Sequence, residues 1–169
     1  MKISQFNLEK QLDRVHDWIK SADQKISISF AIINGVSLAF IIPTSKIIID
    51  HTTYLTSYAF TISLIEALVF LAIAEVCSLL ALFPRLKSKL SSKSILYFGS
   101  ICNMSSKEFK ERIRSETSND LHDDYINQLV ISSQICSIKH HQLKNAIQAF
   151  VVSLIFMFIL LATVIKLNF

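Results

Sequence analysis

Glycine and proline, the residues that most often interrupt helices, are nearly absent from this chain. Among its 169 residues there are only two glycines and two prolines. Both are strong local breakers of regular structure, glycine through its flexibility and proline through its missing amide hydrogen. With so few of them, little in the sequence limits the length of a helix. Long, uninterrupted helices are therefore the expected secondary structure.

The chain also lacks the patterns that mark metal sites, disulfide frameworks and common enzymes. Its three cysteines, Cys77, Cys102 and Cys136, are far apart and form no C-x-x-C pair, which argues against a zinc site or a disulfide framework. It has no Gly-rich phosphate loop, no H-E-x-x-H motif and no G-x-S-x-G motif. We therefore expect no catalytic residue, no bound metal and no cofactor, and a function other than catalysis.

Apolar sequence is what the chain has in abundance, since 51% of its residues are hydrophobic. Three apolar runs stand out, at residues 26–43, 58–83 and 147–165. A helix needs about 20 mostly apolar residues to cross a bilayer, and the shorter first run is bounded by Lys25 and Lys46, which can snorkel to the interfaces. A buried hairpin in a soluble bundle is disfavoured, because nothing else in the chain covers so much apolar surface. We predict an all-α integral membrane protein with three transmembrane helices.

The basic residues are unevenly distributed around these runs and orient the chain. Five lysines and arginines precede the first run, and ten lie at residues 84–146. The loop at residues 44–57 holds only Lys46, and the C-terminal tail holds only Lys166. Cytoplasmic segments of membrane proteins carry the excess of lysine and arginine. The N-terminus and residues 84–146 are therefore predicted to be cytoplasmic, and the loop and the C-terminus to lie outside.

Residues 1–25, before the first run, have the pattern of an amphipathic cytoplasmic helix. Asn7 is of the residue type that favours the N-cap position of such a helix. Apolar side chains recur at helical spacing, at Leu8, Leu12, Val15, Ile19 and Ala22. No glycine or proline separates this helix from the first span, so the two are predicted to be continuous.

Residues 84–146 are predicted to form a cytoplasmic helical region. Pro84 ends the second span, and residues 95–99 read as a short buried segment that ends in a turn. Ser105 and Glu108 have the spacing of a capping box, in which each residue's side chain bonds the other's backbone amide. A short helix is therefore expected to begin there.

The last helix is expected to be long, because no glycine or proline occurs from about residue 120 to residue 166. Asp123 and Asp124 near its start suit the helix dipole. One face of this helix carries the stripe Gln128, Ser132, Ile135 and Lys139. The polar members of this stripe could hydrogen-bond a base and pair with a phosphate. A helix seam with polar partners from the first helix explains the stripe about as well.

Small residues are spaced four apart within the first two spans. They are Ser27, Ala31, Gly35 and Ala39 in the first and Ala59, Ser63 and Ala67 in the second. This spacing lets helices approach closely, either within one subunit or between subunits. A homo-oligomer formed through these faces is the simplest way for so small a protein to open a pore.

Two carboxylates, Glu66 and Glu75, interrupt the second span. A charge is costly in lipid, so both should face protein, water or the membrane interface. They are nine residues apart and therefore point to opposite sides of the helix. For Glu66, an interfacial position and a pore-lining or gating role both stay open.

Several short motifs, taken in their order and spacing, form a familiar set. An opening helix at residues 8–18 leads into A-D-Q-K at 22–25, just before the first span. F-P-R at 83–85 closes the second span, and I-L-Y-F-G follows at 95–99. The polar stripe that ends at Lys139 runs into the last span. In this combination the chain resembles the transmembrane effectors of Pycsar anti-phage defence systems.

The resemblance implies a concrete function. Such effectors act beside a pyrimidine nucleotide cyclase, which makes cyclic CMP or cyclic UMP when phage infects the cell. The effector senses the nucleotide and impairs the bacterial inner membrane, so that the cell stops growing or dies before the phage matures. The implied partners are the cyclic nucleotide, the lipid bilayer and the cyclase, with no nucleic acid. The alternative is a structural or adaptor membrane protein that recruits a cytoplasmic partner and has no ligand of its own.

Candidate ligand residues follow from the chemistry of a cyclic mononucleotide. Its single negative charge should meet a cytoplasmic arginine or lysine, and its base can stack on an aromatic ring. The candidates for the phosphate contact are Arg85, Lys139 and Lys25. Tyr97 and Phe98 are the candidates for stacking on the base, and Gln128 is the candidate for its edge. For each of these residues taken singly, a structural role is the favoured competing interpretation.

Overall fold

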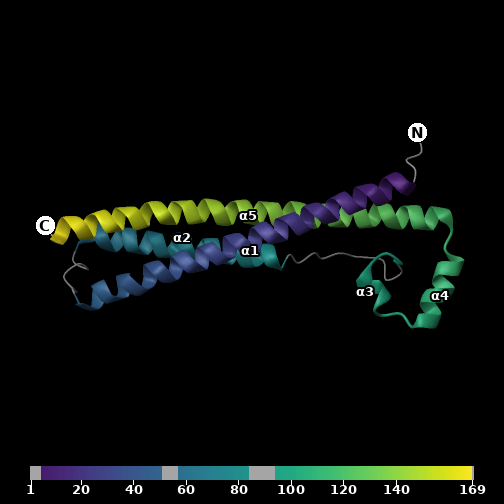
Figure 1. Cartoon of the computed structure of the whole chain (residues 1–169), viewed down its shortest axis with the longest axis horizontal. Coiled ribbons are helices and arrows are strands. Elements are labelled where there is room, and N and C mark those ends of the chain that lie inside the picture. Colours follow the sequence, from purple (N-terminus) through teal and green to yellow (C-terminus); the bar gives the residue numbers. More distant parts are fainter. Residues whose placement is uncertain (1–4, 51–56, 84–93, 169) are drawn as a thin grey trace. The chain divides into compact units, whose positions relative to one another are not determined.

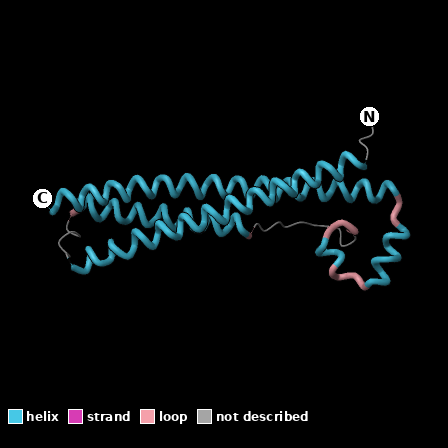
Figure 2. The backbone as a smooth tube through the Cα atoms, viewed as in Figure 1, coloured by secondary structure: helices cyan, strands magenta, loops and turns pink. Residues whose placement is uncertain are grey.

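The structure, a computed structural model, describes residues 5–50, 57–83 and 94–168 of the chain. Within these ranges it consists of helices and the turns that connect them, with no strand (Figures 1 and 2). The helices are α1 (Gln5–Asp50), α2 (Tyr58–Leu82), α3 (Phe98–Ile101), α4 (Ser106–Ser115) and α5 (Ser118–Asn168). The predicted all-α fold is confirmed.

Helix α1 is one uninterrupted helix, so the predicted continuity of the N-terminal helix with the first span is confirmed. Two expectations about its ends are wrong. The helix already includes Gln5, so Asn7 lies within it and is not its N-cap. It also continues through Pro43, so that residues 44–50 are helical rather than part of a loop.

Local bonds and packing explain why α1 continues past Pro43. Proline removes one backbone hydrogen bond, but hydroxyl side chains nearby can supply others within a membrane helix. The Thr44 hydroxyl donates to the carbonyl of Phe40 at 2.7 Å. Beyond the proline, Ile47 packs against the core cluster that contains Phe60. The burial of this last part of the helix offsets the lost backbone bond.

The residues fall into two compact units. The polar unit comprises Met1–Ala22 and Pro84–Ile138, and the apolar unit comprises Asp23–Phe83 and Lys139–Phe169. Helices α1 and α5 each contribute residues to both units, because each is continuous across the boundary. The predicted long last helix is confirmed, with no break between Ser118 and Asn168.

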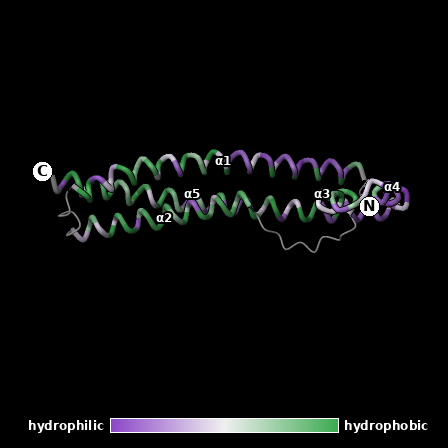
Figure 3. Tube along the Cα trace, turned by 90° about the horizontal axis from the view of Figure 1, so that it is seen from below, coloured by the Kyte–Doolittle hydropathy of each residue, from purple (hydrophilic) through white to green (hydrophobic). Residues whose placement is uncertain are grey.

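Three helices of the described chain are long and apolar enough to cross a membrane, as expected. They are α1, α2 and α5, and the hydrophobic colouring of Figure 3 gathers on α2 and on one part of each longer helix. Each of them exposes large apolar side chains, for example Leu38 (60%), Ile62 (58%) and Ile155 (54%). So much exposed apolar surface is unfavourable in water and favourable against the hydrocarbon of a lipid bilayer.

The interior of the apolar unit is made of aliphatic and aromatic side chains, some of them small. One cluster consists of Ile33, Leu71, Ala74 and Ala149. Beside it, the rings of Phe70 and Phe156 stack with their centroids 6.0 Å apart. The packing of α2 against α1 and α5 therefore defines the core of this unit.

The two small-residue faces have different surroundings. On α2, Ser63 and Ala67 are buried, so this face packs within the chain. On α1, Ala31, Gly35 and Ala39 are exposed, and a Cβ added at Gly35 would meet nothing within 4 Å. The small-residue face of α1 is thus left on the surface of the single chain.

The two carboxylates of α2 are each half-buried. Glu75 accepts a hydrogen bond from the hydroxyl of Ser37 on α1 at 3.0 Å, and Ser37 itself is buried. Glu75 therefore faces protein, which compensates for its charge or polarity within the apolar unit. A gating role for Glu66 or Glu75 stays a prediction.

Candidate functional site

In the polar unit, the short segment after residue 93 is held by one carboxylate on α5. Asp124 Oδ2 accepts hydrogen bonds from the Ser94 hydroxyl at 2.8 Å and from the amides of Ile95 and Leu96 at 3.1 and 3.3 Å. Asp124 was expected to complement a helix dipole, but α5 begins at Ser118, more than one turn earlier. Its role is instead to cap residues 94–96.

The hydroxyl of Ser94 accepts the remaining hydrogen bonds that hold this segment. It accepts hydrogen bonds from the amides of Leu96 and Tyr97 at 3.2 and 3.1 Å and from Gln128 Nε2 at 3.2 Å. Gln128 is buried, with 8% of its surface exposed. Gln128 and Asp124 are four residues apart, so one face of α5 anchors the segment.

Gly99 lets the Tyr97 ring fold back over the chain. A Cβ at position 99 would lie 2.4 Å from Tyr97 Cε1, closer than any real Cβ contact. Another residue at this position would displace the ring. The predicted short segment at 95–99 therefore exists, although its end, at α3 (Phe98–Ile101), is helical.

The predicted capping box at the start of α4 is confirmed. Ser105 Oγ accepts from the amide of Glu108 at 3.2 Å, and Glu108 accepts from the amide of Ser105 at 2.7 Å. At the other end, the side chain of Thr117 hydrogen-bonds Asp120 in the first turn of α5. This bond lowers the pKa of Asp120, helped by the bond from the Thr117 amide. Both ends of the α4–α5 connection are thus tied by local hydrogen bonds.

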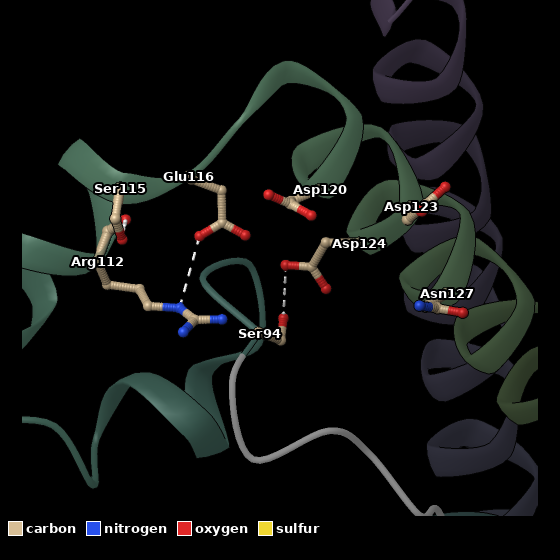
Figure 4. A pocket seen from close by; sticks show the side chains of 8 residues that line it. All are labelled: Ser94, Arg112, Ser115, Glu116, Asp120, Asp123, Asp124 and Asn127. Carbon is tan, nitrogen blue, oxygen red and sulfur yellow. Dashed lines mark hydrogen bonds and ion pairs between the residues drawn. The ribbon is translucent and has the colours of Figure 1, made fainter.

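A cleft of about 290 Å³ opens where α4, the start of α5 and Ser94 meet (Figure 4). It is lined by Ser94, Arg112, Ser115, Glu116, Asp120, Asp123, Asp124 and Asn127. Four carboxylates and one guanidinium therefore face this space. Its volume is at the lower end of the range for small-molecule sites.

The one guanidinium of the cleft is loosely paired. Arg112 Nε lies 3.6 Å from Glu116 Oε2, which is an ion pair but too long for a hydrogen bond. Both atoms are buried, and neither has a hydrogen-bond partner in the part of the chain that the structure describes. An arginine with unused donors suits a phosphate oxygen, because its planar fork can bind two oxygens at once.

Two of the residues predicted from the sequence come together here. Tyr97 and Gln128 both contact Ser94, which lines the cleft. Arg85 and the side chain of Phe98 lie outside the described residues.

The other two predicted residues belong to the apolar unit. Lys25 is exposed, whereas Lys139 is buried, with 7% exposed, and forms an ion pair with Asp23. Lys139 therefore already has an anionic partner. Sequence reasoning missed Arg112, although its spacing of four residues from Glu116 is a signal that separates it from Arg114.

The described residues contain no group of three or more His, Cys, Asp or Glu side chains placed to hold a metal ion. The chemistry that the cleft offers is hydrogen bonding and charge pairing. It has acceptors in excess and one cationic donor.

Comparison with known proteins then decides the family. A model of the Pycsar effector protein domain matches residues 7–166. The chain belongs to the Pycsar effector family. The Pycsar effector protein GmPycTM of Gulbenkiania mobilis is 33% identical to this chain over an alignment 165 residues long. The match covers 82% of this chain and 83% of that protein. No solved structure matches this chain.

The resemblance seen in the sequence is confirmed by this membership. With three membrane-competent helices, this Pycsar effector is a membrane effector of anti-phage defence.

Proposed function

We propose that this Pycsar effector senses a cyclic pyrimidine mononucleotide, cyclic CMP or cyclic UMP, and then impairs the bacterial inner membrane. The infected cell stops growing or dies before the phage matures. A pyrimidine nucleotide cyclase is the functional partner that supplies the signal. One observation carries the proposal: α1 and α5 are each a single helix shared by a membrane-competent unit and a polar unit with a ligand-sized cleft.

The cleft of the polar unit is the proposed nucleotide site. Arg112 meets the phosphate through the donors that Glu116 leaves unused. Tyr97 stacks on the base, and Gln128 positions the segment that carries Tyr97.

The basic and aromatic candidates beyond the cleft keep their proposed roles from the sequence. Arg85 and Lys25 stay candidate phosphate contacts, and Phe98 stays a candidate stacking residue, as the sequence predicts. Lys139 serves as a phosphate contact only if it releases Asp23, since the two are paired.

The membrane step follows from a change in helix packing. A ligand shifts an equilibrium between two packings by its difference in affinity for them. The exposed face with Ala31, Gly35 and Ala39 allows copies of α1 to associate. In this proposal the half-buried Glu66 and Glu75 line or gate the opening between such copies.

The test is calorimetric titration of the detergent-purified full chain with cyclic CMP and cyclic UMP, with cyclic AMP as the control ligand. Saturable binding of a pyrimidine nucleotide is expected. Arg112→Ala should weaken this binding at least tenfold, because it removes the one cation of the cleft. Arg114→Ala is the matched control, since Arg114 is exposed on the same helix but does not line the cleft.

The same variants are then expressed with the cyclase in cells that carry a membrane-potential dye. Depolarisation on infection is expected for the wild type and for Arg114→Ala and not for Arg112→Ala. A well-folded protein that binds none of the nucleotides would instead support an adaptor that recruits a cytoplasmic partner.

A further inference from the structure

We infer that the cleft of the polar unit selects cyclic CMP over cyclic UMP, because its lining offers carboxylate acceptors to the exocyclic amine of cytosine. This inference rests on the proposed function. It adds the identity of the base, which neither the proposed site nor the family decides.

Acceptors dominate the lining of the cleft. Asp120 and Asp124 are already engaged by Thr117 and by residues 94–96. Glu116 and Asp123 are the two lining carboxylates whose side chains accept no hydrogen bond within the described residues.

Glu116 is the more constrained of these two carboxylates. Only 10% of its side chain is exposed, and its Oε2 accepts no hydrogen bond within the described residues. A buried carboxylate oxygen without a donor is costly, so a ligand N–H that reaches it is strongly favoured. Within the part of the chain that the structure describes, its one charged contact is Arg112 at 3.6 Å.

Asp123 supplies an acceptor on the far wall. Figure 4 shows Asp123 and Asn127 on α5, across the cleft from Arg112 on α4. Asp123 is exposed and its side chain has no hydrogen-bond partner among the described residues, so the side chain is free to turn toward a ligand. A nucleotide whose phosphate meets Arg112 therefore extends its base toward acceptors.

The two pyrimidines differ at the atom that these acceptors would meet. Cytosine presents an amino group at position 4, which donates to aspartate or glutamate, whereas uracil presents a carbonyl oxygen, which only accepts. A carboxylate opposite that carbonyl leaves two acceptors facing each other and two groups unsatisfied. Asn127 does not discriminate, because its amide both donates and accepts.

Calorimetry on the detergent-purified full chain tests the inference. Cyclic CMP is expected to bind about tenfold more tightly than cyclic UMP, the discrimination typical of one such hydrogen-bonded pair. Glu116→Gln and Asp123→Asn each replace an acceptor by an amide of the same shape that can also donate. In at least one of them the preference should fall toward equal binding. Asp17→Asn, an exposed residue that does not line the cleft, is the control and should keep the wild-type ratio.

The outcomes separate this inference from the proposed function. Equal or tighter binding of cyclic UMP by the wild type overturns the inference and leaves nucleotide sensing intact. A preference for cyclic CMP that both variants retain also overturns it, because the selection then lies outside this cleft. Binding of neither nucleotide removes the proposed function itself.

Discussion

At the scale of single residues, Asp124 shows how one carboxylate can organise a segment that has little regular structure. Its Oδ2 takes three donors from residues 94–96, and two of these donors are backbone amides. Hydrogen bonds to a charged acceptor are stronger than those between neutral groups. The geometry of one cleft wall, including Ser94, therefore depends on this side chain.

Asp124→Ala should release the segment without unfolding the helices. The loss of charge-assisted bonds costs about 2 kcal/mol, so amide hydrogen exchange at Ile95 and Leu96 should become about 30-fold faster. Asp123→Ala is the matched control, because the side chain of Asp123 makes no hydrogen bond within the described residues. Unchanged protection of both amides in Asp124→Ala would contradict the assigned role.

The capping box of α4 predicts an acid-sensitive helix start. The hydrogen bond from the Ser105 amide, with help from its side chain, lowers the pKa of Glu108. A lowered folded-state pKa means that the bond contributes fully above the ordinary pKa and is lost as pH falls through the lowered value. The NMR signal of the Ser105 amide should therefore shift in that acidic window. In Glu108→Gln the shift should disappear, and its persistence would assign the change to another group.

At the scale of elements, an ion pair links α1 to α5 inside the apolar unit. The side chain of Lys139 is 9% exposed and that of Asp23 is 44% exposed. A buried cation is costly without a counter-charge, while exposure of the partner weakens the attraction. We therefore expect the pair to fix the register of the two helices more than it adds stability.

Removal of Asp23 should reduce the stability of the apolar unit more than exchange of Asp23 and Lys139 with each other. Asp23→Ala leaves the buried ammonium of Lys139 uncompensated and should destabilise the apolar unit by about 1–2 kcal/mol. The double variant Asp23→Lys/Lys139→Asp should recover part of that loss, because the opposite charges face each other again. Thermal unfolding in detergent measures both. A double variant whose loss of stability equals the sum of the losses in Asp23→Lys and Lys139→Asp would show that the pair does not couple α1 to α5.

At the scale of the whole molecule, the charge distribution predicts the orientation of the chain in the membrane. The segments before the first span and after the second hold fifteen of the seventeen lysines and arginines. The positive-inside rule places both segments in the cytoplasm. The polar unit, with its cleft, would then face the compartment in which a cyclase works.

Cysteine labelling tests this orientation. In a chain with Cys77→Ala and Cys136→Ala, the exposed Cys102 of the polar unit should react with a membrane-impermeant maleimide only after cell lysis. Lys166→Cys, at an exposed position near the C-terminus, should react in intact spheroplasts when Cys102 is also replaced by alanine. The reverse pattern would invert the topology.

Features that depend on neighbours along the chain were predictable from the sequence. The long helices follow from the scarcity of glycine and proline, and the spans follow from apolar length. The capping box joins Ser105 to Glu108, only three residues away. These interactions need no knowledge of distant segments, because helix geometry alone brings residues three and four apart together.

Only the tertiary structure decided which distant residues meet. Ser94 hydrogen-bonds Asp124, which is 30 residues away in the sequence, and Lys139 pairs with Asp23, which is 116 residues away. Helical spacing separates Asp124 from Asp123 and Arg112 from Arg114, because only Asp124 lies four residues from Gln128 and only Arg112 lies four residues from Glu116. It does not say which distant segment each side chain meets. Which member of a pair is buried or lines the cleft depends on how separate helices pack, and that packing is a property of the folded chain.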